Sequence, residues 1–192
     1  MYRAITWEVL RRGIDLADEV AVAECARETA PQLEWSVDPT RPSMLVAGTD
    51  VTSAIRESNV TAAVSAVSAV PATRAALVER QREAVASAVA HDRGVVMEGR
   101  DIGTVVYPRA QVKIYLTASL EERAKRRFIE LEQKGGGAVI TEVRQQMASR
   151  DHRDITRDDS PLTVAEGAHV VETAGLTPEQ VVERILGFVP KS

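Results

Sequence analysis

The clearest chemical signal in this sequence is the charged turn Glu98-Gly99-Arg100-Asp101. It follows a short apolar run, residues 94–97, of the kind that a buried parallel strand needs. Open α/β sheets bind their ligands beyond the carboxyl ends of such strands. The turn therefore places a guanidinium group and carboxylates where a site for a polar ligand is expected.

Three arginines follow on a predicted helix. Residues 112–116 read as a second strand, and Ser119 and Glu122 form a capping box that starts the helix. Its buried face is expected to carry Leu120, Ala124, Phe128 and Leu131. The arginines that then point elsewhere are Arg123, Arg126 and Arg127. Because a guanidinium group presents five donors in a planar fork, arginines beside a strand end indicate phosphate recognition.

A third charged segment, residues 150–159, mixes both signs. Its charged residues include Arg150, Asp151, Arg153, Asp154, Arg157, Asp158 and Asp159. In an arbitrary chain, such a segment is most often an exposed loop whose weak ion pairs satisfy one another. The alternative is phosphoryl transfer, in which arginines neutralise the charge that spreads over the phosphate oxygens.

The elements that must position these residues are predicted from apolar spacing and breakers. Helices are expected over 2–12 (ended by Gly13), 18–29, 52–70 (broken by Pro71), 73–90, from Ser119 onward, 141–149 and 177–187. Strands are expected at 33–37, 44–47 and 51, with a turn at 48–50, and at 94–98, 112–117 and 169–172. Strands that alternate with helices in this way predict an α/β fold with a small antiparallel insert.

Composition sets further bounds. A chain of 192 residues can bury one core, and its net charge of −4 disfavours a general nucleic-acid or membrane-surface binder. Cys25 is the only cysteine, so no intrachain disulfide is possible and a reducing compartment is expected. No apolar run approaches the ~18 residues of a membrane span, and we expect a cytoplasmic protein. The three histidines have no metal-ligand spacing, and no metal-binding residue is predicted.

Four segments together resemble the bacterial cytidylate kinases. They are MYRAIT at 1–6, SAVSAVPATRAALVERQR at 65–82, EGRDIGTVVYPRA at 98–110 and RDHRDITRDDSPL at 150–162. The resemblance implies the P-loop nucleoside monophosphate kinase fold and transfer of the ATP γ-phosphoryl group, with Mg²⁺, to CMP or dCMP. It also implies a core of residues 1–32 and 72–192 with a lid at about 134–160, and an insert lobe, 33–71, that closes over the monophosphate.

The resemblance also assigns substrate-binding residues. Asp101, Arg74 and Ser65 match positions that bind cytosine, and a carboxylate is the natural acceptor for its exocyclic amine. Arg100 and Arg3 match positions that clamp the monophosphate. Without the family match, Ser65 would be one polar position on an amphipathic helix, and Arg3 and Arg74 would be ordinary surface charges.

The donor side of the site is assigned in the same way. Arg123 and Arg127 match positions that face the ATP phosphates, with an exposed helix face as the alternative. Arg150 and Arg157 would reach phosphates or sugar from the lid, and Asp154 would help to orient the nucleotide. The expected partners are therefore CMP or dCMP and ATP, with no nucleic acid, no membrane and a monomeric state.

One family motif is missing from these residues. The family opens with a strand and a phosphate-binding loop of the form GxxxxGK[ST], and no such string occurs here. From this we expect the natural start to lie upstream of Met1, two strands of the parallel sheet to be missing, and the chain as written to have little or no activity. A CMP-binding or regulatory protein without catalysis, and a kinase for UMP or AMP, are the alternatives.

Overall fold

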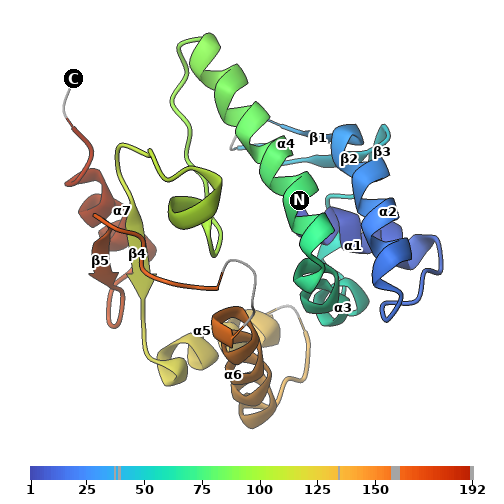
Figure 1. The fold of residues 1–192 in the computed structure, drawn as a ribbon. Helices are drawn as coiled ribbons and strands as arrows, with labels where there is room; N and C mark the ends of the chain where they lie inside the picture. The colour runs from blue at the N-terminus through green and yellow to red at the C-terminus, as the bar shows by residue number, and fades with distance from the viewer. Residues whose placement is uncertain (37, 39, 134, 157–160, 191–192) are drawn as a thin grey trace. The chain divides into compact units, whose positions relative to one another are not determined.

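Helix α1 (Tyr2–Arg11) lies at the centre of the first of two units into which the chain folds, Met1–Val96 and Met97–Ser192 (Figure 1). The computed structural model describes residues 1–190 other than 37, 39, 134 and 157–160. Ile5 and Val9 of α1 are fully buried. No side chain caps the first turn, and Gly13, with φ of +67°, follows the helix end. The predicted helix and its glycine stop are confirmed.

Three further helices pack around α1 in the first unit. Helix α2 (Glu19–Thr29) begins at Asp18, whose side chain accepts a hydrogen bond from the Ala21 N–H at 3.0 Å. Helices α3 (Ser58–Ala69) and α4 (Pro71–Ala90) are separated at Val70, and the break predicted from Pro71 is confirmed. Together these helices and the sheet below bury one apolar cluster, which includes Ile5, Val22, Leu33, Val51, Val67 and Leu77.

The predicted start of the helix before Pro71 is wrong. A short 3₁₀ turn, Ala54–Arg56, replaces its first part, and α3 begins only at Ser58. Glu57, between them, has extended backbone (ψ 159°), which interrupts the helical hydrogen-bond ladder.

The antiparallel sheet of the first unit has the order β1 (Leu33–Trp35), β2 (Met44–Val46), β3 (Thr49–Asp50), and β1 follows a 3₁₀ turn, Ala30–Gln32. The predicted turn at 48–50 is wrong, because Thr49 already pairs with Val46. Ala47 and Gly48 make the turn, with φ of 49° and 77°. Two successive left-handed residues are the type I′ geometry that matches strand twist.

Among the described residues, no single helix is long and apolar enough to cross a membrane. Helices α3 and α4 reach the necessary length and apolar content only when they are counted as one segment, which is bent by 96°.

The second unit contains a parallel pair of strands. Strand β4 (Ile114–Thr117) pairs with β5 (His169–Glu172), with Tyr115 opposite Val170, and α7 (Pro178–Leu186) packs beside β5. Helices α5 (Leu120–Gln133) and α6 (Ile140–Thr156) lie side by side in the connection between the strands (Figure 1). The strands predicted near 112–117 and at 169–172 are confirmed, as is the capping box of Thr177 and Gln180 on α7.

The strand predicted at 94–98 is absent. This segment has no regular structure, and Val96 is 100% exposed. A strand persists only when a neighbour shares its backbone hydrogen bonds. Within the part of the chain that the structure describes, β4 pairs with β5 alone. The prediction of a strand from the apolar content of this run is therefore wrong, because apolar content does not supply a pairing partner.

The structure also revises the charged segment after residue 149. Helix α6 was predicted to end near there, but it continues to Thr156 and includes Arg150, Asp151 and Asp154. At the start of α5, the Ser119 Oγ accepts the Glu122 N–H at 3.2 Å, which is one half of the predicted capping box. The division into a core (1–32 and 72–192) and an insert (33–71) stays a prediction, since the two compact units divide after Val96.

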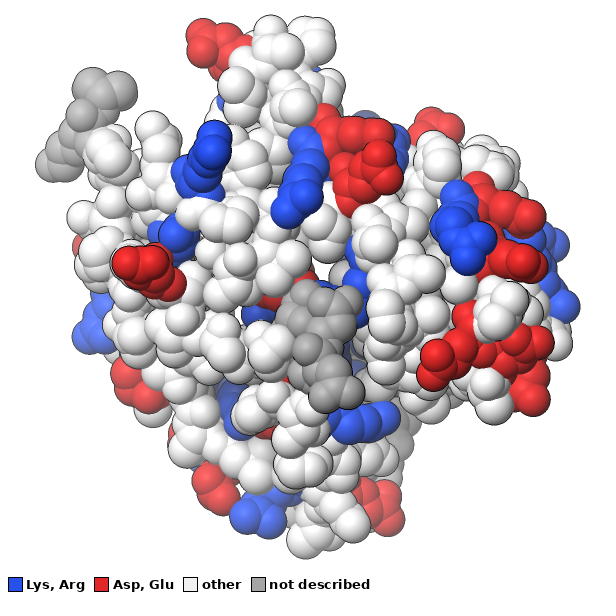
Figure 2. Space-filling view, viewed as in Figure 1, with Lys and Arg blue, Asp and Glu red and all other residues white. Residues whose placement is uncertain are grey.

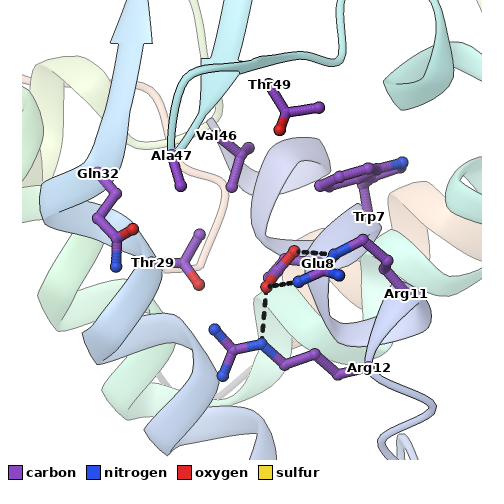
Figure 3. Close-up of a pocket in the computed structure, with 9 residues that line it drawn as sticks. All are labelled: Trp7, Glu8, Arg11, Arg12, Thr29, Gln32, Val46, Ala47 and Thr49. Atoms are coloured by element: carbon purple, nitrogen blue, oxygen red, sulfur yellow. Dashed lines mark hydrogen bonds and ion pairs between the residues drawn. The ribbon is translucent and has the colours of Figure 1, made fainter.

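A buried carboxylate holds the arginine that connects the end of α1 to α2. Glu8 is only 4% exposed and accepts hydrogen bonds from Arg11 and Arg12 at 2.7 Å each (Figure 3). Arg12 also donates to Glu28 of α2 at 2.6 Å. The hydrogen bond from Arg11, aided by that from Arg12, holds the pKa of Glu8 below its usual value although burial acts in the opposite direction. Glu8 therefore stabilises the fold in its ionised form.

We expect the Glu8→Gln variant to lower the free energy of unfolding by about 2 kcal/mol at neutral pH, because charge-assisted hydrogen bonds to a buried acceptor are lost. A depressed pKa gives stability that is present above the unfolded pKa of about 4.3 and is lost as pH falls below it. Urea unfolding from pH 7 to pH 3 should therefore show a steeper loss for wild type than for the variant. Glu28→Gln, at a carboxylate 61% exposed, is the control, with a change within about 0.5 kcal/mol. Equal pH slopes for wild type and Glu8→Gln would contradict this account.

Candidate active site

Helix α6 gathers arginines from three segments of the second unit. The Asp154 Oδ2 lies 3.2 Å from the Nε of Arg100 and 3.9 Å from the Nε of Arg150, and the Asp151 Oδ2 lies 2.7 Å from the Nη1 of Arg123. Residues 150, 151 and 154 share adjacent turns of one helix. We call these five residues the Arg–Asp cluster. It brings together four residues predicted for the site, Arg100, Arg123, Arg150 and Asp154.

The electrostatics of the cluster show how crowded its positive charges are. Burial and the neighbouring Arg100 lower the pKa of Arg150, while Asp154 and Asp151 act against this shift. Guanidinium groups stay protonated in proteins, so the shift means that Arg150 is poorly solvated and close to like charge. A bound anion would replace the missing solvation of Arg150 and would neutralise part of the positive charge around it.

Asp101 lies next to Arg100 in the interior of the second unit and is 5% exposed. It precedes a π-helical turn, Ile102–Val106, and its carbonyl accepts the N–H groups of Val105 and Val106 at 2.9 and 3.2 Å. Turns of this kind carry an extra residue and occur frequently at functional sites. Backbone hydrogen bonds thus fix the position of the residue predicted to recognise the base.

The three arginines of α5 have different partners. The prediction that all three are available for phosphate is wrong for Arg126, which is hydrogen-bonded within the fold. Arg126 donates to the hydroxyl and the carbonyl of Thr173, just after β5, and Thr173 itself is buried. Arg127 pairs with Glu130 on the same helix at 2.8 Å. Arg123 belongs to the Arg–Asp cluster. Arg126 therefore fastens α5 to β5.

The first unit carries the other predicted residues. Arg3 is half-buried, and its Nη1 donates to the Ile55 carbonyl at 3.0 Å and to the Thr61 Oγ1 at 2.8 Å. Arg74 is 2% exposed, with its guanidinium carbon 5.9 Å from the centre of the Tyr2 ring. Neither arginine is thus the ordinary surface charge that the sequence alone allowed.

Ser65 lies half-buried on α3. Arg157 lies outside the described residues. The described site residues are therefore distributed over both units, three in the first and six in the second, and their convergence on one pocket stays a prediction.

A separate hollow lies in the first unit. It has a volume of about 380 Å³ and is lined by Trp7, Glu8, Arg11, Arg12, Thr29, Gln32, Val46, Ala47 and Thr49 (Figure 3). None of these is a predicted site residue. On the face that Figure 2 displays, most of the surface belongs to uncharged residues, and acidic and basic side chains lie in scattered groups among them. Among the described residues, no three His, Cys, Asp or Glu side chains are placed to hold a metal ion.

Sequence reasoning missed three residues that hold the predicted ones in place: Tyr2 beneath Arg74, Thr61 on Arg3 and Asp151 on Arg123. Each lies far along the chain from its partner, and no local spacing connects them. The position of Asp151 beside Arg150 indicated that its carboxylate lies near the site, but the sequence did not indicate that Asp151 contacts Arg123.

The separate roles of the α5 arginines can be tested by stability. Arg126→Ala should lower the free energy of unfolding by about 1 to 2 kcal/mol, because two charge-assisted hydrogen bonds to Thr173 are lost. Arg127→Ala, one position along, removes only an exposed pair and should change it by less than about 0.5 kcal/mol. Chemical denaturation of both variants measures the difference. An equal decrease in the free energy of unfolding for both variants would show that the contacts of Arg126 with Thr173 do not stabilise the fold more than an exposed ion pair does.

Comparisons with known proteins agree with the sequence motifs. A family model described as cytidylate kinase matches residues 1–191. The chain is 45% identical over 192 residues to the cytidylate kinase of Caldanaerobacter subterraneus subsp. tengcongensis, covering all of this chain and 81% of that protein. It is 45% identical over 188 residues to that of Streptomyces avermitilis, covering 98% of this chain and 78% of the relative.

A two-activity relative matches as well. A bifunctional pantoate ligase/cytidylate kinase of a Synechococcus species is 42% identical over 187 residues, 97% of this chain and 34% of that protein. The resemblance drawn from the four sequence segments is confirmed, and with it the α/β fold of the P-loop nucleoside monophosphate kinases. The chain belongs to the cytidylate kinase family.

Proposed function

We propose that this chain functions as a kinase that transfers the γ-phosphoryl group of ATP to CMP or dCMP, which gives CDP or dCDP. The observation that carries the proposal is the Arg–Asp cluster, in which three guanidinium groups from separate segments meet on one helix. Phosphoryl transfer has little covalent chemistry for a protein to perform, so catalysis rests on positioning and on neutralising phosphate charge. The names of the relatives support the choice of CMP as acceptor.

The acceptor side of the proposal follows the residues that the family resemblance assigns to CMP. The carboxylate of Asp101 accepts a hydrogen bond from the exocyclic amine of cytosine, and Arg74 and Ser65 donate to the acceptors of the ring. Arg100 and Arg3 hold the monophosphate so that one of its oxygens faces the donor phosphorus in line. The burial of Asp101 and Arg74 supports this assignment, because buried polar groups fix orientation and discriminate between bases.

The donor side uses the arginines of α5 and α6. Arg123 and Arg127 bind the phosphates of ATP, while Arg150 and Arg157 neutralise the transferred group and Asp154 orients the nucleotide. Mg²⁺ belongs to the proposal as the companion of ATP, and when bound it would offset part of the phosphate charge that the arginines meet. The crowded positive charge of Arg150 beside Arg100 supports an anionic ligand there.

We propose in addition a monomer located in the cytoplasm, where both nucleotides are available. Cys25 is 1% exposed, and burial raises the pKa of its thiol, so it is a packing residue and not a reactive thiol. Light scattering of the purified chain tests the oligomeric state.

Base selectivity is the sharpest test of the acceptor site. By calorimetry, CMP should bind at least tenfold more tightly than UMP, because a well-placed polar pair discriminates between bases by about 1 to 3 kcal/mol. In the Asp101→Asn variant the side chain offers a donor as well as an acceptor, so the ratio should fall toward one. Thermal unfolding of the variant checks that its fold is intact. Equal affinities of the wild-type chain for CMP and UMP would refute the assignment, and preference for UMP or AMP would favour those kinases.

A second function, CMP binding without catalysis, is favoured by one observation: the sequence contains no GxxxxGK[ST] string. A coupled ATP-consumption assay with CMP and Mg²⁺, run beside CMP calorimetry, separates the two functions. Binding without turnover fits the second function, whereas turnover that depends on Arg100 and Arg150 fits the kinase and contradicts the expectation of low activity.

A further inference from the structure

Arg123 is held at two points by groups from different elements. Its Nε donates to the carbonyl of Ala118, one residue beyond β4, at 3.1 Å. Its Nη1 lies 2.7 Å from the Asp151 Oδ2 on α6. Neither contact uses Nη2. The guanidinium plane is therefore fixed between the end of a strand and a neighbouring helix while one nitrogen remains for an external acceptor.

The contact with Asp151 differs from the other ion pairs of α5. The side chains of Arg123 and Asp151 are 34% and 25% exposed, whereas the second pair between α5 and α6, Glu121 with Arg144, is 3.2 Å long and exposed at both ends. Water screens an exposed pair and leaves its side chains mobile. Asp151 also lies one turn from Asp154, so its contact belongs to the Arg–Asp cluster. Glu121 forms its ion pair with Arg144 and acts on Arg123 only as a nearby charge, the weakest of the influences on its own pKa, so it serves as a control that keeps the direct contact of Arg123 intact.

We propose that Asp151 is a positioning residue for phosphate binding: it fixes Arg123 so that the remaining guanidinium nitrogen meets a phosphate oxygen of the donor nucleotide. An arginine that is already ordered loses less side-chain freedom when it binds, which increases affinity without a new contact. This inference rests on the proposed function. It adds to that function a residue that does not touch the nucleotide.

Two other roles of Asp151 make different predictions. If Asp151 only fastened α5 to α6, its loss would resemble the loss of Glu121. If it competed with phosphate for Arg123, its removal would tighten nucleotide binding. Positioning requires instead that its removal weakens MgATP binding while CMP binding is maintained.

The experiment compares Asp151→Asn with the matched control Glu121→Gln in the full chain. Calorimetry measures MgATP and CMP separately, and ¹⁵N NMR follows the Nε–H signal of Arg123, assigned with an Arg123→Lys variant. We expect Asp151→Asn to weaken MgATP about tenfold, to change CMP affinity less than twofold and to make the Arg123 signal exchange-averaged. Asp151→Glu should restore most of the MgATP affinity, and Glu121→Gln should change neither affinity nor the signal.

Several results would overturn the inference. Unchanged or tighter MgATP binding in Asp151→Asn excludes positioning, and so does an equal loss in Glu121→Gln. A wild-type chain that binds CMP but not MgATP refutes the role of Asp151 and leaves the CMP site in place. A wild-type chain that binds neither nucleotide refutes the proposed function itself, so the two failures are distinguishable.

Discussion

Guanidinium groups repel one another, and the second unit overcomes this repulsion with two carboxylates on one helix. Asp151 and Asp154 separate three arginines that come from a turn, from α5 and from α6 itself. Three positive charges against two negative ones leave an excess of one. The cluster depends on the spacing of residues 150, 151 and 154 on a single helix. The α5–α6 packing brings Arg123 to this helix, and the turn after Gly99 brings Arg100.

The same logic of paired charge appears in the first unit in a form that serves stability. Glu8 accepts hydrogen bonds from Arg11 and Arg12, and Arg12 also donates to Glu28 of α2. Arg80 of α4 stacks on Trp35 with 4.9 Å between the guanidinium carbon and the ring centre, and donates to the Leu33 carbonyl at 3.0 Å. Arginine thus serves two purposes in this chain. Arg80 and Arg126 join elements through backbone carbonyls, whereas Arg100, Arg123 and Arg150 meet the aspartates of α6 and form a candidate phosphate site.

Local signals predicted much of this arrangement. Gly13, Pro71 and the Thr177–Gln180 capping box act within a few residues, and each marks an element boundary that the structure confirms. Predictions failed where the outcome depends on distant partners. Val96 belongs to an apolar run that forms no strand, because a strand requires a neighbour that local sequence does not name. The contacts of Arg126 with Thr173, 47 positions away, and of Arg123 with Asp151 were unreadable for the same reason.

The parallel pairing of β4 with β5 has a consequence for how the chain assembles. Ile114 and His169 are partners, yet the whole of α5 and α6 lies between them in the chain. Closing so long a connection costs more chain entropy than forming the neighbouring helix pair, whose contacts are local. We therefore expect the helical hairpin, with its charged residues already gathered, to form early on the folding pathway, and the strand ladder to close around it afterwards.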